Sequence, residues 1–168
     1  MPVPFNFVAI TVLTLVTLQR VAEVLYARRN EKRLIMSGAR EYAPEHYWAI
    51  VALHIGWLAG LWLMVGQEQI NAFWLAAFIV LQVLRLWVLA TLGERWTTRI
   101  IVIPGAPLIK AGPYRFMRHP NYAIVAGEIF TLPMAFGLTA FAVVFSLLNA
   151  GILAIRIRAE NRALRLCA

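Results

Sequence analysis

One short segment of the chain, residues 112–122, holds side chains of the types that bind polar ligands. Its sequence, GPYRFMRHPNY, places Tyr114, Arg118, His119 and Tyr122 close together. Arginine and histidine can hold anionic or polar groups, whereas tyrosine offers a flat ring and a hydroxyl. Pro120 is suited to the first turn of a helix, where its missing N–H costs nothing. The segment is a candidate ligand site, although a positively charged loop beside a membrane span would have a similar composition.

A second group of polar side chains lies near the C-terminus. Arg156 and Glu160 are four residues apart, which places them on one helical face, and Asn161 follows directly. The two charged residues form either an ordinary helix ion pair or a site in which Glu160 binds a cationic or hydroxyl-rich ligand and Arg156 holds a carboxylate. The chain has no nucleophile elbow, phosphate-binding loop or zinc-type His-Glu-x-x-His spacing, so we expect no metal site.

The rest of the chain must carry these residues on membrane-embedded helices. Hydrophobic residues make up 61% of the 168 residues and charged residues 14%, which is too apolar for an ordinary soluble domain. We predict an all-α polytopic membrane protein with about five transmembrane helices, the last two forming a tight hairpin at Gly137. The predicted apolar segments are residues 3–27, 47–65, 73–92, 121–136 and 139–155.

The chain length predicts a single domain, residues 1–168. Residues 1–93 form its three-helix membrane part, and residues 94–168 contain the polar loop, the hairpin and the basic tail.

The positive charge is distributed in a way that predicts orientation. The formal net charge is +8, and the basic residues gather in residues 28–40, 95–119 and 156–165, after the first, third and fifth apolar segments. The positive-inside rule therefore places the N-terminus outside and the C-terminus in the cytoplasm. Because each cluster flanks an apolar segment, we expect contact with membrane lipids and no nucleic acid partner.

Several polar residues lie within the predicted spans. Arg20 and Glu23 are neighbours on one helix face, and we favour a structural role for them. Arg85, with Gln82 beside it, could meet a ligand or pair with Glu23 or Glu128; the sequence leaves these alternatives open. We interpret His54 as a hydrogen-bonded packing residue, although it could instead be a ligand or a proton carrier.

Three local patterns give further expectations. The Gly56-x-x-x-Gly60 spacing predicts close contact between helices. Residues 28–45 are polar and contain Gly38 and Pro44, so we expect a surface connection with room for a short interfacial helix. The β-branched residues 100–103 are expected to lie extended against the rest of their loop.

The motifs resemble the isoprenylcysteine carboxyl methyltransferase family, within the broader group that includes phospholipid N-methyltransferases. The resemblance rests on Gly112-Pro113-Tyr114, on Arg118-His119-Pro120-x-Tyr122, on the helical hairpin and on the Arg156-x-x-x-Glu160 tail. It covers roughly the C-terminal half of the chain. It implies an integral-membrane enzyme that binds S-adenosylmethionine at the cytoplasmic face and methylates a lipophilic substrate from the bilayer, with S-adenosylhomocysteine as the product.

The resemblance also implies roles for individual residues. The cofactor would be bound by Tyr114, Arg118, His119, Pro120, Tyr122, Glu160 and Asn161. Arg156, Glu160 and His119 would be the catalytic candidates: Arg156 orients a carboxylate acceptor, whereas a phenol or enol acceptor needs His119 or Glu160 as a base. Many relatives carry two consecutive acids in the tail, and Asn161 stands here in place of the second.

The resemblance orders the possible acceptors as well. Residues 94–99, ERWTTR, resemble small bacterial members, some of which O-methylate long-chain alkylresorcinol or alkylpyrone polyketides. A lipid phenol or enol is therefore our first expectation, a prenylcysteine-like carboxylate the second and a phospholipid amine the third. The implied location is a bacterial inner membrane.

Two readings compete with an enzyme. A non-catalytic membrane scaffold or lipid-binding protein would bind no cofactor and would tolerate changes at His119, Tyr122 and Glu160. A transporter would gather its polar residues near mid-membrane and often shows an internal repeat. Here most polar residues lie at one predicted face and no repeat is evident, which favours the enzyme.

Overall fold

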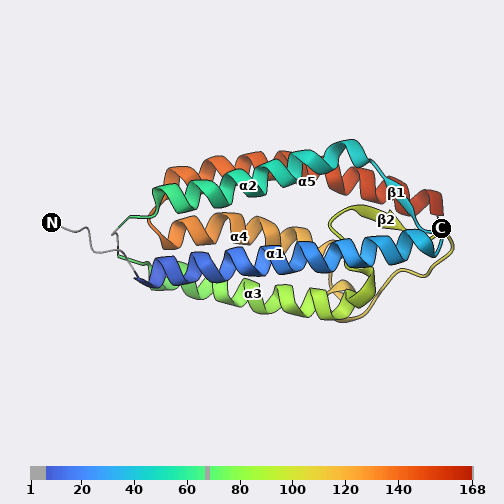
Figure 1. Cartoon of the computed structure of the whole chain (residues 1–168), viewed down its shortest axis with the longest axis horizontal. Coiled ribbons are helices and arrows are strands. Elements are labelled where there is room, and N and C mark those ends of the chain that lie inside the picture. Colours follow the sequence, from blue (N-terminus) through green and yellow to red (C-terminus); the bar gives the residue numbers. More distant parts are fainter. Residues whose placement is uncertain (1–6, 67–68, 168) are drawn as a thin grey trace.

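Long helices running along one axis build the molecule (Figure 1). A computed structural model describes residues 7–66 and 69–167, and within them lie five α-helices. Residues 3–6 of the first predicted span and the last residue of the tail fall outside the described residues. The helices are α1 (Phe7–Met36), α2 (Tyr47–Met64), α3 (Ala72–Leu92), α4 (Pro120–Ala135) and α5 (Thr139–Cys167).

The helices are apolar enough for a membrane. In the described residues, four helical segments are long and apolar enough to cross a membrane. These segments include α1, α2, α3 and α5. Their outward side chains include Leu15, Leu63, Val83 and Leu147, all more than half exposed, as expected for a surface that faces lipid. The chain is therefore a helical membrane protein, as its composition predicted.

The remaining helix, α4, is shorter and more buried than the other four. Its 16 residues extend over about 24 Å, less than the roughly 30 Å hydrocarbon core of a bilayer. It packs against α3 on one side and α5 on the other (Figure 1). Burial of Ile124, Ile129 and Leu132 places its apolar side chains inside the protein rather than in lipid.

Two regions differ from the predicted boundaries. The α1 helix continues through Arg33 to Met36, and the chain leaves it at Gly38, whose φ of 91° is readily adopted only by glycine. Arg, Glu and Lys are good helix formers, so the polar residues extend the helix instead of ending it. The basic tail is helical, as expected from its residues, and it continues α5 without a break to Cys167.

A small antiparallel sheet departs from the all-α prediction. Strand β1 (Arg40–Tyr42) pairs with β2 (Ile100–Val102), with Glu41 opposite Ile101. Residues 100–102 are extended as predicted, but they pair with the connection after α1 and not with their own loop. The sheet holds two loops that are far apart in sequence.

Buried charges link three helices, α1, α3 and α4. Arg85 of α3 donates from Nε to Glu23 Oε1 at 2.7 Å, from Nη2 to Glu23 Oε2 at 2.6 Å and from Nη1 to Glu128 Oε2 at 3.0 Å. Arg20 donates to Glu23 at 3.0 Å and to Glu128 at 2.8 Å, and Gln82 donates to Glu128 at 2.8 Å. We call Arg20, Glu23, Arg85 and Glu128 the charge network. Its two arginines and two glutamates balance, so the favoured structural role is consistent with the geometry.

The predicted close contact of the Gly56-x-x-x-Gly60 face is confirmed. A Cβ at Gly60 would lie 2.5 Å from Phe141 Cε2, whereas one at Gly56 would lie 3.9 Å from Phe145. Both phenylalanines belong to α5. Because Gly56 and Gly60 carry no side chain, α2 can approach α5 closely at these two positions.

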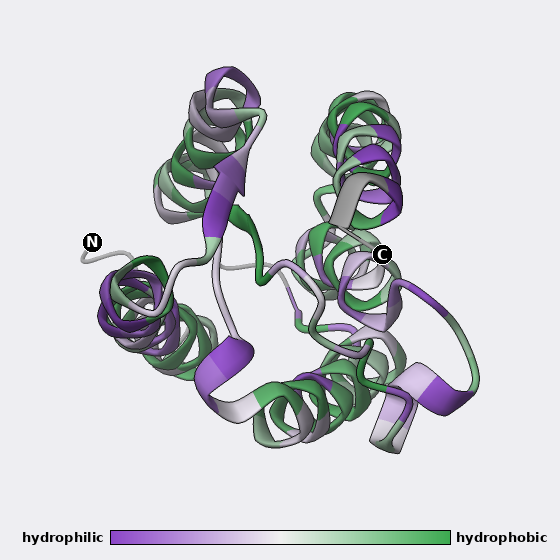
Figure 2. Ribbon diagram, turned by 90° about the vertical axis from the view of Figure 1, so that its right-hand side faces the viewer, coloured by the Kyte–Doolittle hydropathy of each residue, from purple (hydrophilic) through white to green (hydrophobic). Residues whose placement is uncertain are grey.

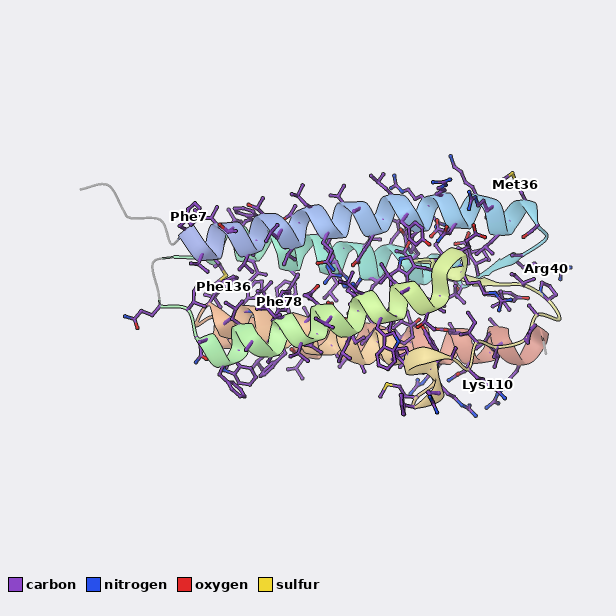
Figure 3. The ribbon with its side chains drawn as sticks, turned by 90° about the horizontal axis from the view of Figure 1, so that it is seen from below. Phe7, Met36, Arg40, Phe78, Lys110 and Phe136 are labelled. Atoms are coloured by element: carbon purple, nitrogen blue, oxygen red, sulfur yellow. The ribbon has the colours of Figure 1, made fainter. Side chains whose placement is uncertain are left out.

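All the long polar segments lie at one end of the bundle. Met36, Arg40 and Lys110 are at this end, whereas Phe7 and Phe136 are at the other (Figure 3). We call the first the loop end. Viewed from there, hydrophilic segments cover the ends of largely hydrophobic helices (Figure 2). The basic clusters that lie apart in sequence therefore share one end.

Candidate functional site

A large cavity occupies the part of the bundle nearest the loop end. Its volume is about 1700 Å³, and its walls come from α1, α2, α5, β2 and the segment that follows β2. Pockets for drug-sized ligands measure roughly 300–1,000 Å³. The cavity is therefore larger than a typical pocket for a single ligand of that size.

Four side chains that line this cavity contact one another. Tyr122 donates its hydroxyl to Glu160 Oε2 at 2.6 Å, and His119 Nε2 lies 3.2 Å from Asn161 Oδ1. His119 Nδ1 is 3.7 Å from Glu160 Oε2, and the His119 and Tyr122 rings stack with centroids 5.4 Å apart. We call these residues the polar quartet. They come from residues 119–122 and 160–161, which are far apart in the sequence.

The start of α4 and the end of α5 position the polar quartet. Pro120 is buried at the first position of α4, as predicted, and His119 stands just before it as the N-cap residue. Tyr122 follows within the first turn. Because α5 continues past the membrane-length segment as one helix packed on α4, it returns Glu160 and Asn161 to this turn.

The hydroxyl of Tyr122 keeps its proton in this environment. A tyrosine phenol ordinarily has a pKa of about 10 and is protonated at neutral pH. The phenol is therefore a donor at physiological pH, and it fixes one oxygen of the Glu160 carboxylate. The other carboxylate oxygen remains available to a ligand, since a carboxylate can accept several hydrogen bonds.

Tyr114 is held on a neighbouring turn, the 3-10 helix Gly112–Arg115. It packs against a buried cluster that contains Trp96 and Ile124, and burial raises the pKa of its phenol. Gly112 has a φ of 52°, and a Cβ there would overlap the side chain of Thr91. Only glycine permits this close approach, which brings Tyr114 to the cavity.

Arg156 lines the cavity but does not form the ordinary helix ion pair with Glu160 in the described residues. Its side chain is buried, and Nη2 donates to the Thr98 carbonyl oxygen at 2.8 Å. Its guanidinium also lies near the Tyr122 hydroxyl. A single backbone hydrogen bond leaves further guanidinium donors for a ligand. Arg118, by contrast, is exposed where it lines the same cavity.

A second charged group lines the cavity and was not predicted as part of the site. Arg99 donates to Glu41 at 2.7 Å, lies 3.7 Å from Glu31 and stacks 4.4 Å from the Tyr47 ring centroid. The hydrogen bond to Glu41 is the main reason that the pKa of Arg99 is raised. This cluster joins α1, α2, β1 and the residue just before β2. Sequence patterns gave no signal for it, because the partners meet only through the register of the sheet.

Some of the residues that line the cavity carry buried polar atoms that lack a partner among the described residues. Trp96 Nε1, a donor, and Asn121 Oδ1, an acceptor, are buried without a hydrogen bond in the described structure, and both residues line the cavity. Buried polar groups are normally satisfied. These two atoms are exceptions to that rule.

The wall formed by α1 and α2 is mostly apolar. Val21 and Leu25 of α1, with Val51 and Ile55 of α2, line the cavity, and three of these four side chains are exposed. The same cavity thus combines the polar quartet with a hydrophobic wall.

Comparison with known proteins gives a consistent result. The model of the isoprenylcysteine carboxyl methyltransferase family matches residues 74–166. YpbQ, an uncharacterized protein of Bacillus subtilis, is 38% identical over 158 residues, covering 91% of this chain and 94% of its own. An uncharacterized protein of Haemophilus influenzae is 25% identical over 142 residues, covering 81% and 83%. No solved structure gives a significant match.

Proposed function

The chain belongs to the isoprenylcysteine carboxyl methyltransferase family, and from this premise we propose that it transfers the methyl group of S-adenosylmethionine to an oxygen of a lipophilic acceptor. The observation that carries the proposal is the polar quartet, whose residues lie in direct contact at one cavity and include His119, Tyr122 and Glu160 of the motifs that resemble the family.

The residues of the polar quartet suit the polar parts of this cofactor. S-adenosylmethionine, when bound, supplies an activated methyl group on a sulfonium. Glu160 can accept from ribose hydroxyls or the amino group, while Tyr122 fixes its carboxylate. His119 and Arg118 can hold the cofactor carboxylate, and Tyr114 offers a ring for adenine or the sulfonium. Asn161 keeps a polar contact with His119 at the position where many relatives carry an acid.

The remaining cavity suits the acceptor. Arg156, anchored by the Thr98 carbonyl, is placed to orient the polar end of the acceptor. The apolar side chains of α1 and α2 fit a hydrocarbon chain that enters from the bilayer. Methyl transfer is an in-line displacement, so alignment and the exclusion of water are the main contributions required of the protein.

We further propose that the loop end faces the cytoplasm, with five spans and the N-terminus outside. The shared location of the basic segments supports this orientation (Figure 3). In this arrangement α4 is the fourth span along the chain, and its buried side chains pack against other helices rather than lipid. The whole chain, residues 1–168, then works as one unit in a bacterial inner membrane, with residues 94–168 providing most of the cofactor contacts.

Methyl transfer from labelled donor tests the proposal. The purified protein in lipid nanodiscs would be supplied with long-chain phenols, alkyl carboxylates and phosphatidylethanolamine in separate reactions. We expect label on an oxygen acceptor, with a large loss for Glu160→Gln and His119→Ala and little change for Arg158→Gln, whose side chain lines a separate groove. Label on the phospholipid amine alone would refute oxygen transfer. Equal activity of all variants would refute the proposed site.

A further inference from the structure

One histidine inside the bundle lines the large cavity and has no place in the site described so far. His54 belongs to α2, is partly buried, and lies on the cavity wall beside Ile50, Val51 and Trp57. The sequence favoured a packing role for it. Its single recorded hydrogen bond is consistent with packing, yet that bond also determines what the other ring nitrogen can do.

The hydrogen bond defines the tautomer of His54. Nδ1 lies 2.8 Å from the carbonyl oxygen of Ile50, one turn earlier in the same helix. A carbonyl can only accept, so Nδ1 carries the hydrogen and, in the neutral ring, Nε2 carries a lone pair. Nε2 is therefore the basic atom of His54, and His54 lines the cavity.

The other candidate bases are already engaged. Glu160 accepts the Tyr122 hydroxyl at 2.6 Å, and its Oε2 also lies 3.7 Å from His119 Nδ1. His119 turns its second nitrogen toward Asn161 Oδ1 at 3.2 Å. Both residues thus have partners within the polar quartet, which we assign to the cofactor. His54 Nε2, by contrast, has no hydrogen-bond partner among the described side chains.

The depth of His54 suits an acceptor placed beyond the cofactor. Trp57 Nε1 donates to the Ile129 carbonyl at 3.2 Å, which puts these positions of α2 and α4 at one level. Both helices begin at the loop end. His54 is three residues nearer to that end than Trp57, and Tyr122 is seven residues nearer than Ile129. The difference of four residues places His54 about 6 Å deeper than Tyr122.

We propose that His54 is the general base for a hydroxyl-bearing acceptor, which makes the substrate a lipid phenol or enol rather than a carboxylate or an amine. This inference rests on the proposed methyltransferase function. Nε2 takes the proton of the acceptor hydroxyl, and the oxygen bonds to the methyl carbon as the carbon–sulfur bond breaks. The electron pair of that bond stays on sulfur, which becomes a neutral thioether, and the histidine later returns its proton to water.

The surrounding charges bear on this step, because a nearby cation opposes protonation of the imidazole and stabilises an oxyanion. The cations that act on His54 are Arg20 of α1, Arg85 of α3 and Arg156 of α5. Arg20 and Arg85 are neutralised by the carboxylates of Glu23 and Glu128 within the charge network. Arg156 has no such partner in the described residues, and its guanidinium can stabilise the negative charge that develops on the acceptor oxygen.

Acceptors of different acidity test the role of His54. The wild-type protein, His54→Ala and His54→Gln would receive labelled donor with an alkyl phenol, with an alkyl nitrophenol already ionised at the assay pH, or with an alkyl carboxylate. His46→Ala is the matched control, because His46 lies in the separate smaller groove. We expect each His54 variant to lose roughly 10²-fold or more on the alkyl phenol. On the ionised nitrophenol they should stay close to wild type, and added imidazole should restore part of the His54→Ala rate.

The possible outcomes distinguish the role of His54 as a base from the proposed methyltransferase function. Variants that match the wild type on the alkyl phenol, or that lose equally on the ionised acceptor, would overturn the base assignment. Loss of S-adenosylhomocysteine binding in both variants would assign His54 a structural role and overturn it as well. Transfer by the wild type to carboxylates alone would refute the hydroxyl acceptor but leave the methyltransferase standing. A wild-type protein that binds no S-adenosylhomocysteine would refute both.

Discussion

Replacing Arg85 by glutamine should destabilise the protein more than replacing Arg85 and Glu128 together. Arg85 makes hydrogen bonds of 2.7, 2.6 and 3.0 Å to Glu23 and Glu128. The exposed fractions of the Arg85, Glu23 and Glu128 side chains are only 7%, 7% and 2%. After Arg85→Gln, one arginine, Arg20, faces two buried glutamates. The double variant retains one arginine and one glutamate and is again neutral.

The size of the effect follows from burial and charge. Removing one partner of a buried ion pair costs about 3–5 kcal/mol, because the remaining charge is left uncompensated. Arg20 already contacts both carboxylates and can take over part of the role of Arg85. We therefore expect Arg85→Gln to lose about 4 kcal/mol of unfolding free energy, and the added Glu128→Gln change to recover about 2 kcal/mol, within the usual range of coupling energies.

Reversible unfolding of the detergent-solubilised protein by SDS, with thermal melting as a second measure, would test this prediction. At about 2–4 °C per kcal/mol for a chain of this size, the single variant should melt on the order of 10 °C below the wild type. Gln82→Ala is a useful milder control, since it removes one neutral donor to Glu128. A single variant as stable as the wild type would refute the account of the charge network. So would a double variant that is less stable than Arg85→Gln.

Two further predictions concern the site and the helix packing. Tyr122→Phe removes the 2.6 Å hydrogen bond to Glu160 and should weaken S-adenosylhomocysteine binding by roughly tenfold, as measured by calorimetry; unchanged affinity would mean that the bond does not position the carboxylate. Gly60→Ala should destabilise the α2–α5 contact by about 1–3 kcal/mol because its Cβ meets the ring of Phe141. Gly56→Ala, whose Cβ makes an ordinary contact, should change stability little in the same unfolding assay, and equal effects of the two substitutions would contradict the packing.

Sequence patterns predicted the parts of the fold that depend on composition and local signals. Long apolar segments marked the helices, Pro120 marked the start of α4, and the Gly56-x-x-x-Gly60 spacing marked a helix contact. They missed the continuation of α1 to Met36, since good helix formers in a polar segment can equally form a surface connection.

Features that depend on distant partners were beyond local patterns. The pairing of Arg40–Tyr42 with Ile100–Val102 joins segments on either side of two helices, and the Arg99 cluster exists only because of that register. The residues of the polar quartet were named from their motif, but their mutual contacts were not. The partners of Arg85 were left open for the same reason: a carboxylate on either of two other helices could satisfy it.

The central claim is that the polar quartet forms a cofactor site, and calorimetric titration with S-adenosylhomocysteine tests it most directly. The wild type in detergent or lipid nanodiscs should show saturable binding, and Glu160→Gln should bind at least roughly tenfold more weakly because a charged acceptor is lost. Arg158→Gln, which alters a residue of the separate groove, should bind like the wild type. Folded wild-type protein that does not bind, or a Glu160→Gln variant with wild-type affinity, would contradict the account.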